Sequence, residues 1–265
     1  MRTISHNNKA IILGCGNSTG VPAMGACPGG DWGKCDPKNP RNKRLRASIY
    51  LEYQGLRLLV DTSSDLREQY LANGLTGIDA VILTHAHADH ISGIDNLRQL
   101  YFSQGKHPIP VYATRETFQD VQGTFGYLFH SHALDIYPKA LEARVINGPF
   151  SIGDVQIQVM RQPHGSVESL GLRFGNLAYS TDFKTLDATS LNQLRDLDVW
   201  IVDCLNIEEE HPTHSHFAQT LEYIQEIQPQ QAYLTHMSRR IDYDHLKGLL
   251  PPGIQPAYDG LTILF

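Results

Sequence analysis

The sequence predicts an α/β fold in a single domain. Short apolar runs with the composition of buried strands recur, as at residues 80–84, 199–203 and 231–235. Stretches with helical character follow such runs, as at residues 94–104 and 217–228. The chain has 265 residues, a length at which α/β and two-sheet folds often form one unit. We therefore expect residues 1–265 to form one domain, large enough to bury its core without cross-links.

Composition narrows the class of protein. Apolar residues make up 41% of the chain and the net charge is −6, which fits a soluble globular protein and argues against nucleic-acid binding by bulk charge. The four cysteines are too few for a disulfide scaffold. Residues 1–8 lack the apolar core of a signal peptide, and no run reaches the length of a membrane span. We expect a cytoplasmic protein with free thiols and no membrane partner.

Residues 84–93, Thr-His-Ala-His-Ala-Asp-His-Ile-Ser-Gly, concentrate potential metal ligands directly after the apolar run 80–84. Such a turn at a strand end is a common position for catalytic groups. Imidazole suits zinc and similar ions, and carboxylate suits harder ions such as manganese. His85 and His87 alternate with alanines, so both rings could converge on one ion. Asp89 and His90 would then reach a second ion beside it.

Further candidates follow other apolar runs or stand between residues that fix the backbone. His164 lies between a proline and a glycine, Asp182 follows an apolar run, and His236 follows residues 231–235. A carboxylate such as that of Asp182 has two oxygens and can bridge two cations. Asp61 also follows an apolar run. It could orient a ligand of the metal site, or begin the helix expected at residues 64–73.

His85-x-His87-x-Asp89-His90 resembles the signature of the metallo-β-lactamase superfamily, and the later candidates match that family in order. The resemblance implies an αββα sandwich, with two mixed sheets flanked by helices and the site at one end between the sheets. It implies two divalent metal ions, Zn²⁺ or Mn²⁺, with iron also possible. The implied ligands of the two ions are His85, His87 and His164 for the first, and Asp89, His90 and His236 for the second, with Asp182 as the bridge.

The loop at residues 16–46 resembles the N-terminal region of the cyclic phosphodiesterases associated with carbon–phosphorus lyase. In those proteins three cysteines of this loop and a late histidine hold a structural zinc. This chain has only Cys27 and Cys35 in the loop, and Arg239 stands where that histidine would be. A structural zinc needs four closed ligands, so we expect none here. The basic residues between Arg41 and Arg46 form either a phosphate contact or a solvated loop.

Residues 211–216 hold a second histidine cluster. In the phosphodiesterases that the chain resembles, a histidine matching His214 assists departure of the leaving group, and transfer-RNA 3′-end nucleases carry a comparable one. We therefore expect His214 to be the general acid, because histidine exchanges protons near neutral pH, and we name His214 and Asp89 as catalytic. His216 could orient His214 or cap the helix at 217–228.

The predicted function is hydrolysis of a small phosphodiester, cyclic or nucleotide-like, by a metal-activated hydroxide. RNA 3′-end processing and thioester or lactone hydrolysis are alternatives on the same fold, and a metal-binding scaffold is the non-enzyme alternative. The chain lacks an inserted arm that could grip RNA, so we expect a small substrate as partner and not nucleic acid. A homodimer is expected only because homodimers are the commonest oligomers.

Overall fold

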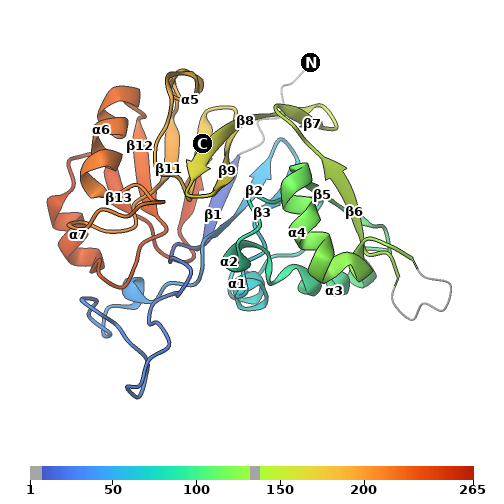
Figure 1. The fold of residues 1–265 in the computed structure, drawn as a ribbon, viewed down its shortest axis with the longest axis horizontal. Coiled ribbons are helices and arrows are strands. Elements are labelled where there is room, and N and C mark those ends of the chain that lie inside the picture. The colour runs from blue at the N-terminus through green and yellow to red at the C-terminus, as the bar shows by residue number, and fades with distance from the viewer. Residues whose placement is uncertain (1–7, 132–137) are drawn as a thin grey trace.

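The computed structural model describes residues 8–131 and 138–265. Two mixed seven-stranded sheets pack face to face, with helices on the outside of both (Figure 1). This arrangement confirms the predicted αββα sandwich. In the described part of the chain no helix is long and apolar enough to cross a membrane.

The first sheet is built mainly from the N-terminal half, in the order β14-β1-β2-β3-β4-β5-β6. Its members β3 to β6 run parallel, whereas the pairs that β1 forms with β14 and β2, and β2 with β3, are antiparallel. The strands are β1 (Lys9–Gly14), β2 (Ser48–Tyr53), β3 (Leu56–Val60), β4 (Ala80–Ile82), β5 (Ile109–Ala113), β6 (Leu141–Val145) and β14 (Thr262–Leu264).

The second sheet follows in the order β13-β12-β11-β10-β9-β8-β7. Strands β10 to β13 are parallel, so their carboxyl ends meet at one edge of the sheet, where ligands gather in such sheets. The strands are β7 (Phe150–Ile152), β8 (Val155–His164), β9 (Val167–Phe174), β10 (Leu177–Ser180), β11 (Val199–Asp203), β12 (Gln231–Thr235) and β13 (Ile254–Pro256).

Helices α1 to α4 accompany the first sheet and α5 to α7 the second (Figure 1). They are α1 (Leu66–Ala72), α2 (Ala88–Ile91), α3 (Leu97–Ser103), α4 (Arg115–Phe125), α5 (Ala188–Gln193), α6 (Phe217–Ile227) and α7 (Tyr243–Leu249), with short 3-10 turns at Pro40–Asn42, Ile94–Asn96 and Gly126–Leu128. Three short strands, β6, β7 and β13, were not predicted from the sequence. They lie at or next to sheet edges, and β6 exposes most of its residues, so their apolar pattern is weak.

Strand β1 shows how the sequence divides the core into two layers. Ala10 and Ile12 face the core between the sheets, whereas Ile11 and Leu13 face a second core beneath the helices of the first sheet. This division follows from the two-residue period of a strand, which sends successive side chains to opposite faces. A strand buried on both faces therefore reads as a continuous apolar run.

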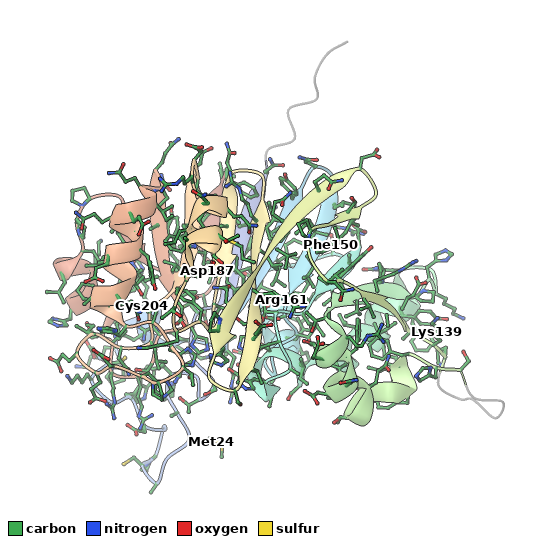
Figure 2. The ribbon with its side chains drawn as sticks, turned by 45° about the horizontal axis from the view of Figure 1, so that its top comes forward. Met24, Lys139, Phe150, Arg161, Asp187 and Cys204 are labelled. Atoms are coloured by element: carbon green, nitrogen blue, oxygen red, sulfur yellow. The ribbon has the colours of Figure 1, made fainter. Side chains whose placement is uncertain are left out.

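The loop at residues 16–46 extends from one end of the sandwich, with Met24 on its outermost part (Figure 2). Its basic residues are engaged within the protein. The buried Arg44 guanidinium donates to the carbonyl oxygens of Ser238 and Ile241, at 3.1 and 2.8 Å. Arg46 pairs with Asp65 at 2.7 Å. These contacts favour a role inside the fold over the phosphate contact considered from the sequence.

The two cysteines of this loop lie in different surroundings. Cys27 is exposed, whereas the buried Cys35 thiol faces the carbonyl oxygens of Arg239 and Ile241 at 3.4 and 3.1 Å. The Arg239 side chain forms an ion pair with Asp31 at 2.8 Å. The loop is therefore attached to the segment after His236 by hydrogen bonds and an ion pair.

Candidate metal centre

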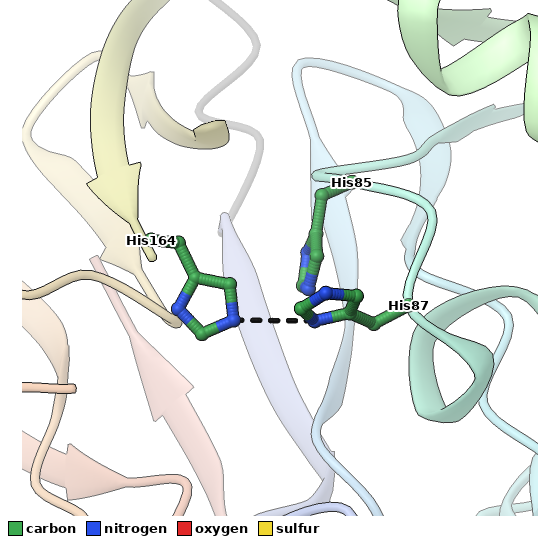
Figure 3. Close-up of side chains that lie close together, drawn as sticks. All are labelled: His85, His87 and His164. Atoms are coloured by element: carbon green, nitrogen blue, oxygen red, sulfur yellow. Dashed lines mark hydrogen bonds between the residues drawn. The ribbon is translucent and has the colours of Figure 1, made fainter. Parts of the chain in front are cut away.

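The structure brings the predicted ligands together at one end of the sandwich, between the two sheets. His85, His87 and His164 offer ligand atoms that all lie within 4.8 Å of one another, as do Asp89, His90 and His236. His85 and His87 follow β4 of the first sheet, whereas His164 ends β8 of the second and points toward them (Figure 3). The site is therefore assembled from segments far apart in the sequence.

Three residues of this region have left-handed backbone within two residues of the end of a strand. Asp61 has φ +63°, Asp182 has φ +56° and His236 has φ +58°. Such values are uncommon for residues other than glycine, and they cluster at functional sites. Each turns the chain sharply at a strand end and places a side chain into the site. Packing between the sheets must hold these conformations.

The histidine group near His164 has its ring nitrogens oriented by the protein. His164 Nδ1 donates a hydrogen bond to the carbonyl oxygen of Thr213 at 2.9 Å. The other ring nitrogen, Nε2, therefore carries a lone pair, and it lies 3.2 Å from His87 Nδ1. Burial and the nearby charge of His90 hold the pKa of His85 well below its usual value, and burial lowers the pKa of His164. Neutral imidazole is the form that binds metals.

Asp182 lies between the two groups. Its Oδ1 is 3.3 Å from His236 Nε2 and 3.7 Å from His164 Nε2, and its Oδ2 is 3.2 Å from His90 Nε2. Asp89 Oδ2 is 3.4 Å from His90 Nε2. Although burial opposes ionisation, His236 and His90 keep the pKa of Asp182 well below its usual value, so the carboxylate stays charged. This position suits a carboxylate that bridges two cations.

Unpartnered buried atoms test whether the residues fit metal ions. Nε2 of His85, of His90 and of His236 is buried and forms no hydrogen bond within residues 8–131 and 138–265. Buried polar atoms without partners are costly, and nitrogen atoms that converge with carboxylate oxygens form a suitable cation site. The donor set therefore fits divalent metal ions.

Asp61 supports the site without facing the ligand atoms. Its Oδ2 accepts from Nδ1 of His90 at 2.7 Å and from Oγ1 of Thr84 at 2.8 Å, and its Oδ1 accepts from the Thr84 amide at 2.7 Å. Both oxygens are thus occupied, and the contact leaves His90 Nε2 as the ligand atom. The alternative reading as a helix terminus is wrong, because α1 begins at Leu66 and Asp65 is its N-cap residue.

His214 lies beside the cluster and is oriented by Asp203, a residue that the sequence analysis did not single out. His214 Nδ1 is 2.9 Å from Asp203 Oδ2, and its Nε2 is 3.9 Å from Asp182 Oδ1. Asp203 ends β11 as a buried aspartate after an apolar run, the same signal that drew attention to Asp61. His216 is the N-cap residue of α6, but its side chain makes no capping hydrogen bond.

A cavity of about 440 Å³ opens beside His85. Arg161 on β8 lines it and pairs with Glu168 at 2.6 Å (Figure 2). Glu116 and Asp120 also line it, so its charged groups are mainly acidic. His107 and His130 are exposed outside the cluster, and His132 lies outside the described residues.

Residues 56–237 match the family described as the Beta-lactamase superfamily domain. The structure resembles that of a new diphosphatase from the PhnP family, with a TM-score of 0.88 and 33% identity over 98% of both chains. Zn²⁺-bound PqqB from Methylobacterium extorquens, at 20% identity over 96% of this chain and 99% of its own, shares the fold with a TM-score of 0.75.

Two curated proteins are also similar in sequence. An octanoyltransferase of Porphyromonas gingivalis is 32% identical over 97% of this chain and 51% of its own length, so the chain spans about half of that protein. A ribonuclease Z of Methanococcus maripaludis is 30% identical over 35% of this chain and 31% of its own. The family match and the likeness over nearly the whole chain together establish that this protein belongs to the metallo-β-lactamase superfamily and resembles the PhnP family within it.

Proposed function

We propose that the protein is a metal-dependent phosphodiesterase that acts on a small phosphodiester, cyclic or nucleotide-like. The observation that carries the proposal is His214, held by Asp203 beside a buried cluster that fits two cations. In a metal-dependent hydrolase the cations activate the attacking water, and a proton donor beside them assists departure of the leaving group. The 33% identity to a PhnP-family diphosphatase supports phosphorus as the centre of attack.

The ligand sets proposed for the two ions are those expected from the sequence. His85, His87 and His164 would hold one ion, Asp89, His90 and His236 the other, and Asp182 would lie between them. When bound, two such ions supply a hydroxide near neutral pH and neutralise charge on the phosphoryl oxygens. Zn²⁺, Mn²⁺ and iron all suit imidazole and carboxylate ligands.

The remaining groups position protons. His214 carries a proton on Nε2 for the leaving oxygen, and Asp203 stabilises the charged ring through Nδ1. Asp89, 11% exposed at its side chain, reaches the mouth of the cluster. There its carboxylate accepts a hydrogen bond from the attacking water and aims the lone pair of that water at phosphorus.

RNA 3′-end processing remains the second candidate, because ribonuclease Z sequences match part of the chain. That activity requires tight RNA binding that weakens steeply with salt. The mainly acidic cavity beside His85 favours the small substrate. The octanoyltransferase match keeps thioester hydrolysis as a further candidate, to be assayed if phosphodiesters fail.

The test combines metal content and turnover in one sample. We expect elemental analysis to find about two ions per chain, and bis(p-nitrophenyl) phosphate to be hydrolysed with Zn²⁺ or Mn²⁺ present. His214→Ala should lower kcat by about 100-fold or more with metal content unchanged. His107→Ala, an exposed histidine outside the cluster, serves as the matched control and should change neither quantity.

The outcomes separate the candidates. Two ions without phosphodiester turnover would overturn the proposed chemistry and leave RNA and thioesters as substrates. No bound metal and no turnover would leave a scaffold protein on a catalytic fold. Full activity in His214→Ala would remove the proposed general acid.

A further inference from the structure

The loop at residues 211–216 contacts the metal centre through two consecutive residues. The carbonyl oxygen of Thr213 accepts a hydrogen bond from Nδ1 of His164 at 2.9 Å. The next residue, His214, holds its ring edge-to-face with that of His164, with the ring centres 4.7 Å apart. Nε2 of His164 and Nε2 of His214 lie 3.7 and 3.9 Å from the same oxygen of Asp182. The position of this loop therefore sets a proposed metal ligand and the proposed proton donor together.

Hydrogen bonds to the end of β11 hold the second half of the loop. The amide of Leu205 donates to the carbonyl oxygen of Ser215 at 3.1 Å. The hydroxyl oxygen of Ser215 lies 2.7 Å from that of Thr220, which donates to the carbonyl oxygen of Asp203 at 2.8 Å. These bonds fix the loop after His214, whereas its first half packs against the turn that follows β8.

Gly165 is the residue at which this turn meets the loop. Gly165 and Ser166 form a two-residue turn between His164 and Val167, which pair across β8 and β9. A Cβ added at Gly165 would lie 2.6 Å from Cγ2 of Thr213, far inside the distance at which two carbon atoms attract each other. Only a residue without a side chain therefore lets the loop approach the turn this closely.

The backbone of Gly165 gives a second reason for a glycine at this position, because its φ of +64° is left-handed. Gly153, in the exposed turn between β7 and β8, has a similar φ of +57°, but no atom lies within 4 Å of a Cβ added there. Both glycines thus meet the same backbone requirement, and Gly165 meets a steric one as well. Substitutions at the two positions can separate these requirements.

We propose that Gly165 and Thr213 are positioning residues for the reaction, and that their close contact sets His164 and His214 at the same time. This inference rests on the proposed function and adds two residues that act through these histidines. A side chain at Gly165 pushes Thr213 outward, so its carbonyl oxygen leaves His164 and the ring of His214 moves away from Asp182. A ligand without its orienting partner binds metal more weakly, and a misplaced proton donor slows the chemical step.

The first test substitutes the two glycines. Gly165→Ala should lower kcat on bis(p-nitrophenyl) phosphate about tenfold or more, change KM less than about twofold, and weaken metal binding about tenfold or more. Steady-state kinetics measures the first two quantities, and competition with a chelator followed by elemental analysis measures the third without any turnover. Gly153→Ala is the matched control, because it strains the backbone in the same way without a steric contact, and should change none of them.

Thr213→Ser supplies a rescue that backbone strain alone would not respond to. It removes Cγ2 but keeps the carbonyl group and the hydroxyl group, whose oxygen lies 3.1 Å from Nδ1 of His211. In the Thr213→Ser background, Gly165→Ala should therefore cause far smaller losses of kcat and metal affinity than in the wild type. If Gly165→Ala does not fold, Thr213→Ile enlarges the same contact without straining the turn, and should show the paired loss.

The outcomes decide between the steric contact and backbone strain. Equal values for Gly165→Ala and Gly153→Ala would overturn the inference, as would a loss that persists in the Thr213→Ser background. A fall in kcat at unchanged metal affinity, or the reverse, would overturn the joint role of the contact. Wild-type protein without phosphodiester turnover would overturn the proposed function alone, because the metal affinities of the variants would still support or contradict the contact.

Discussion

Asp203 accepts a hydrogen bond from His214, with Oδ2 at 2.9 Å from Nδ1 of the ring. The other oxygen of this carboxylate lies 3.7 Å from Nδ1 of His236. One fully buried carboxylate therefore touches both the proposed proton donor and a proposed metal ligand. Because the donor and the ligand share this anchor, the distance between them is fixed by the end of a core strand.

Asp203→Asn should show whether Asp203 acts through His214 or through His236. An amide keeps the size of the side chain but cannot stabilise a charged imidazole, so kcat on bis(p-nitrophenyl) phosphate should fall about 10- to 100-fold, with KM little changed. Steady-state kinetics with elemental analysis of the same sample measures this. Loss of metal at unchanged kcat per bound metal would show that Asp203 acts through His236 instead.

Asp61→Ala should weaken metal binding although Asp61 is not a proposed ligand. The substitution removes the acceptor for His90 Nδ1 and frees the ring to rotate, which should lower metal affinity about 10- to 100-fold. Competition with a chelator, followed by elemental analysis, gives the affinity. Asp154→Ala, in an exposed turn, is the control, and equal affinities in the two variants would contradict the role given to Asp61.

Arg44→Met should destabilise the fold. It leaves the carbonyl oxygens of Ser238 and Ile241 without their buried donor, which should cost about 3 kcal/mol in the free energy of unfolding. Urea denaturation measures the change. Arg67→Met, at an exposed position on α1, should change it by less than about 0.5 kcal/mol. Similar stabilities for the two variants would show that the long loop does not need this anchor.

Asp259 should make stability depend on pH. Burial raises the pKa of Asp259 to about 7, against the hydrogen bonds that its carboxylate accepts from Leu45 and Cys15. An unfolded aspartate titrates near pH ~3.9, so between about pH 4 and 7 the folded state binds the extra proton. The contribution of Asp259 to the free energy of unfolding is therefore full below this window and falls as pH rises through it.

Urea denaturation of the wild type and of Asp259→Asn at pH 5 and pH 8 checks this sign. The amide does not titrate, so the stability of the wild type relative to the variant should be lower at pH 8. A relative stability that rises with pH would show that the hydrogen bonds to the carboxylate outweigh burial.

Much of the site could be predicted because its residues follow apolar strands. His85, Asp182 and His236 each stand just beyond an apolar run, and in an α/β sheet parallel strands place such residues at one edge. Asp203 follows the same rule, but a buried aspartate after a strand does not reveal its partner.

The sequence by itself determined the α/β class and the placing of ligands after apolar strands, because these follow from apolar runs and a local motif. The resemblance of that motif to the metallo-β-lactamase signature implied the αββα layers and the family. Only the tertiary structure decided that Arg44 is buried within the fold and that Asp203 orients His214. Those facts depend on contacts between segments separated by many residues, such as Arg44 with Ser238. Periodicity and local motifs do not encode such distances, whereas the packing of the two sheets does.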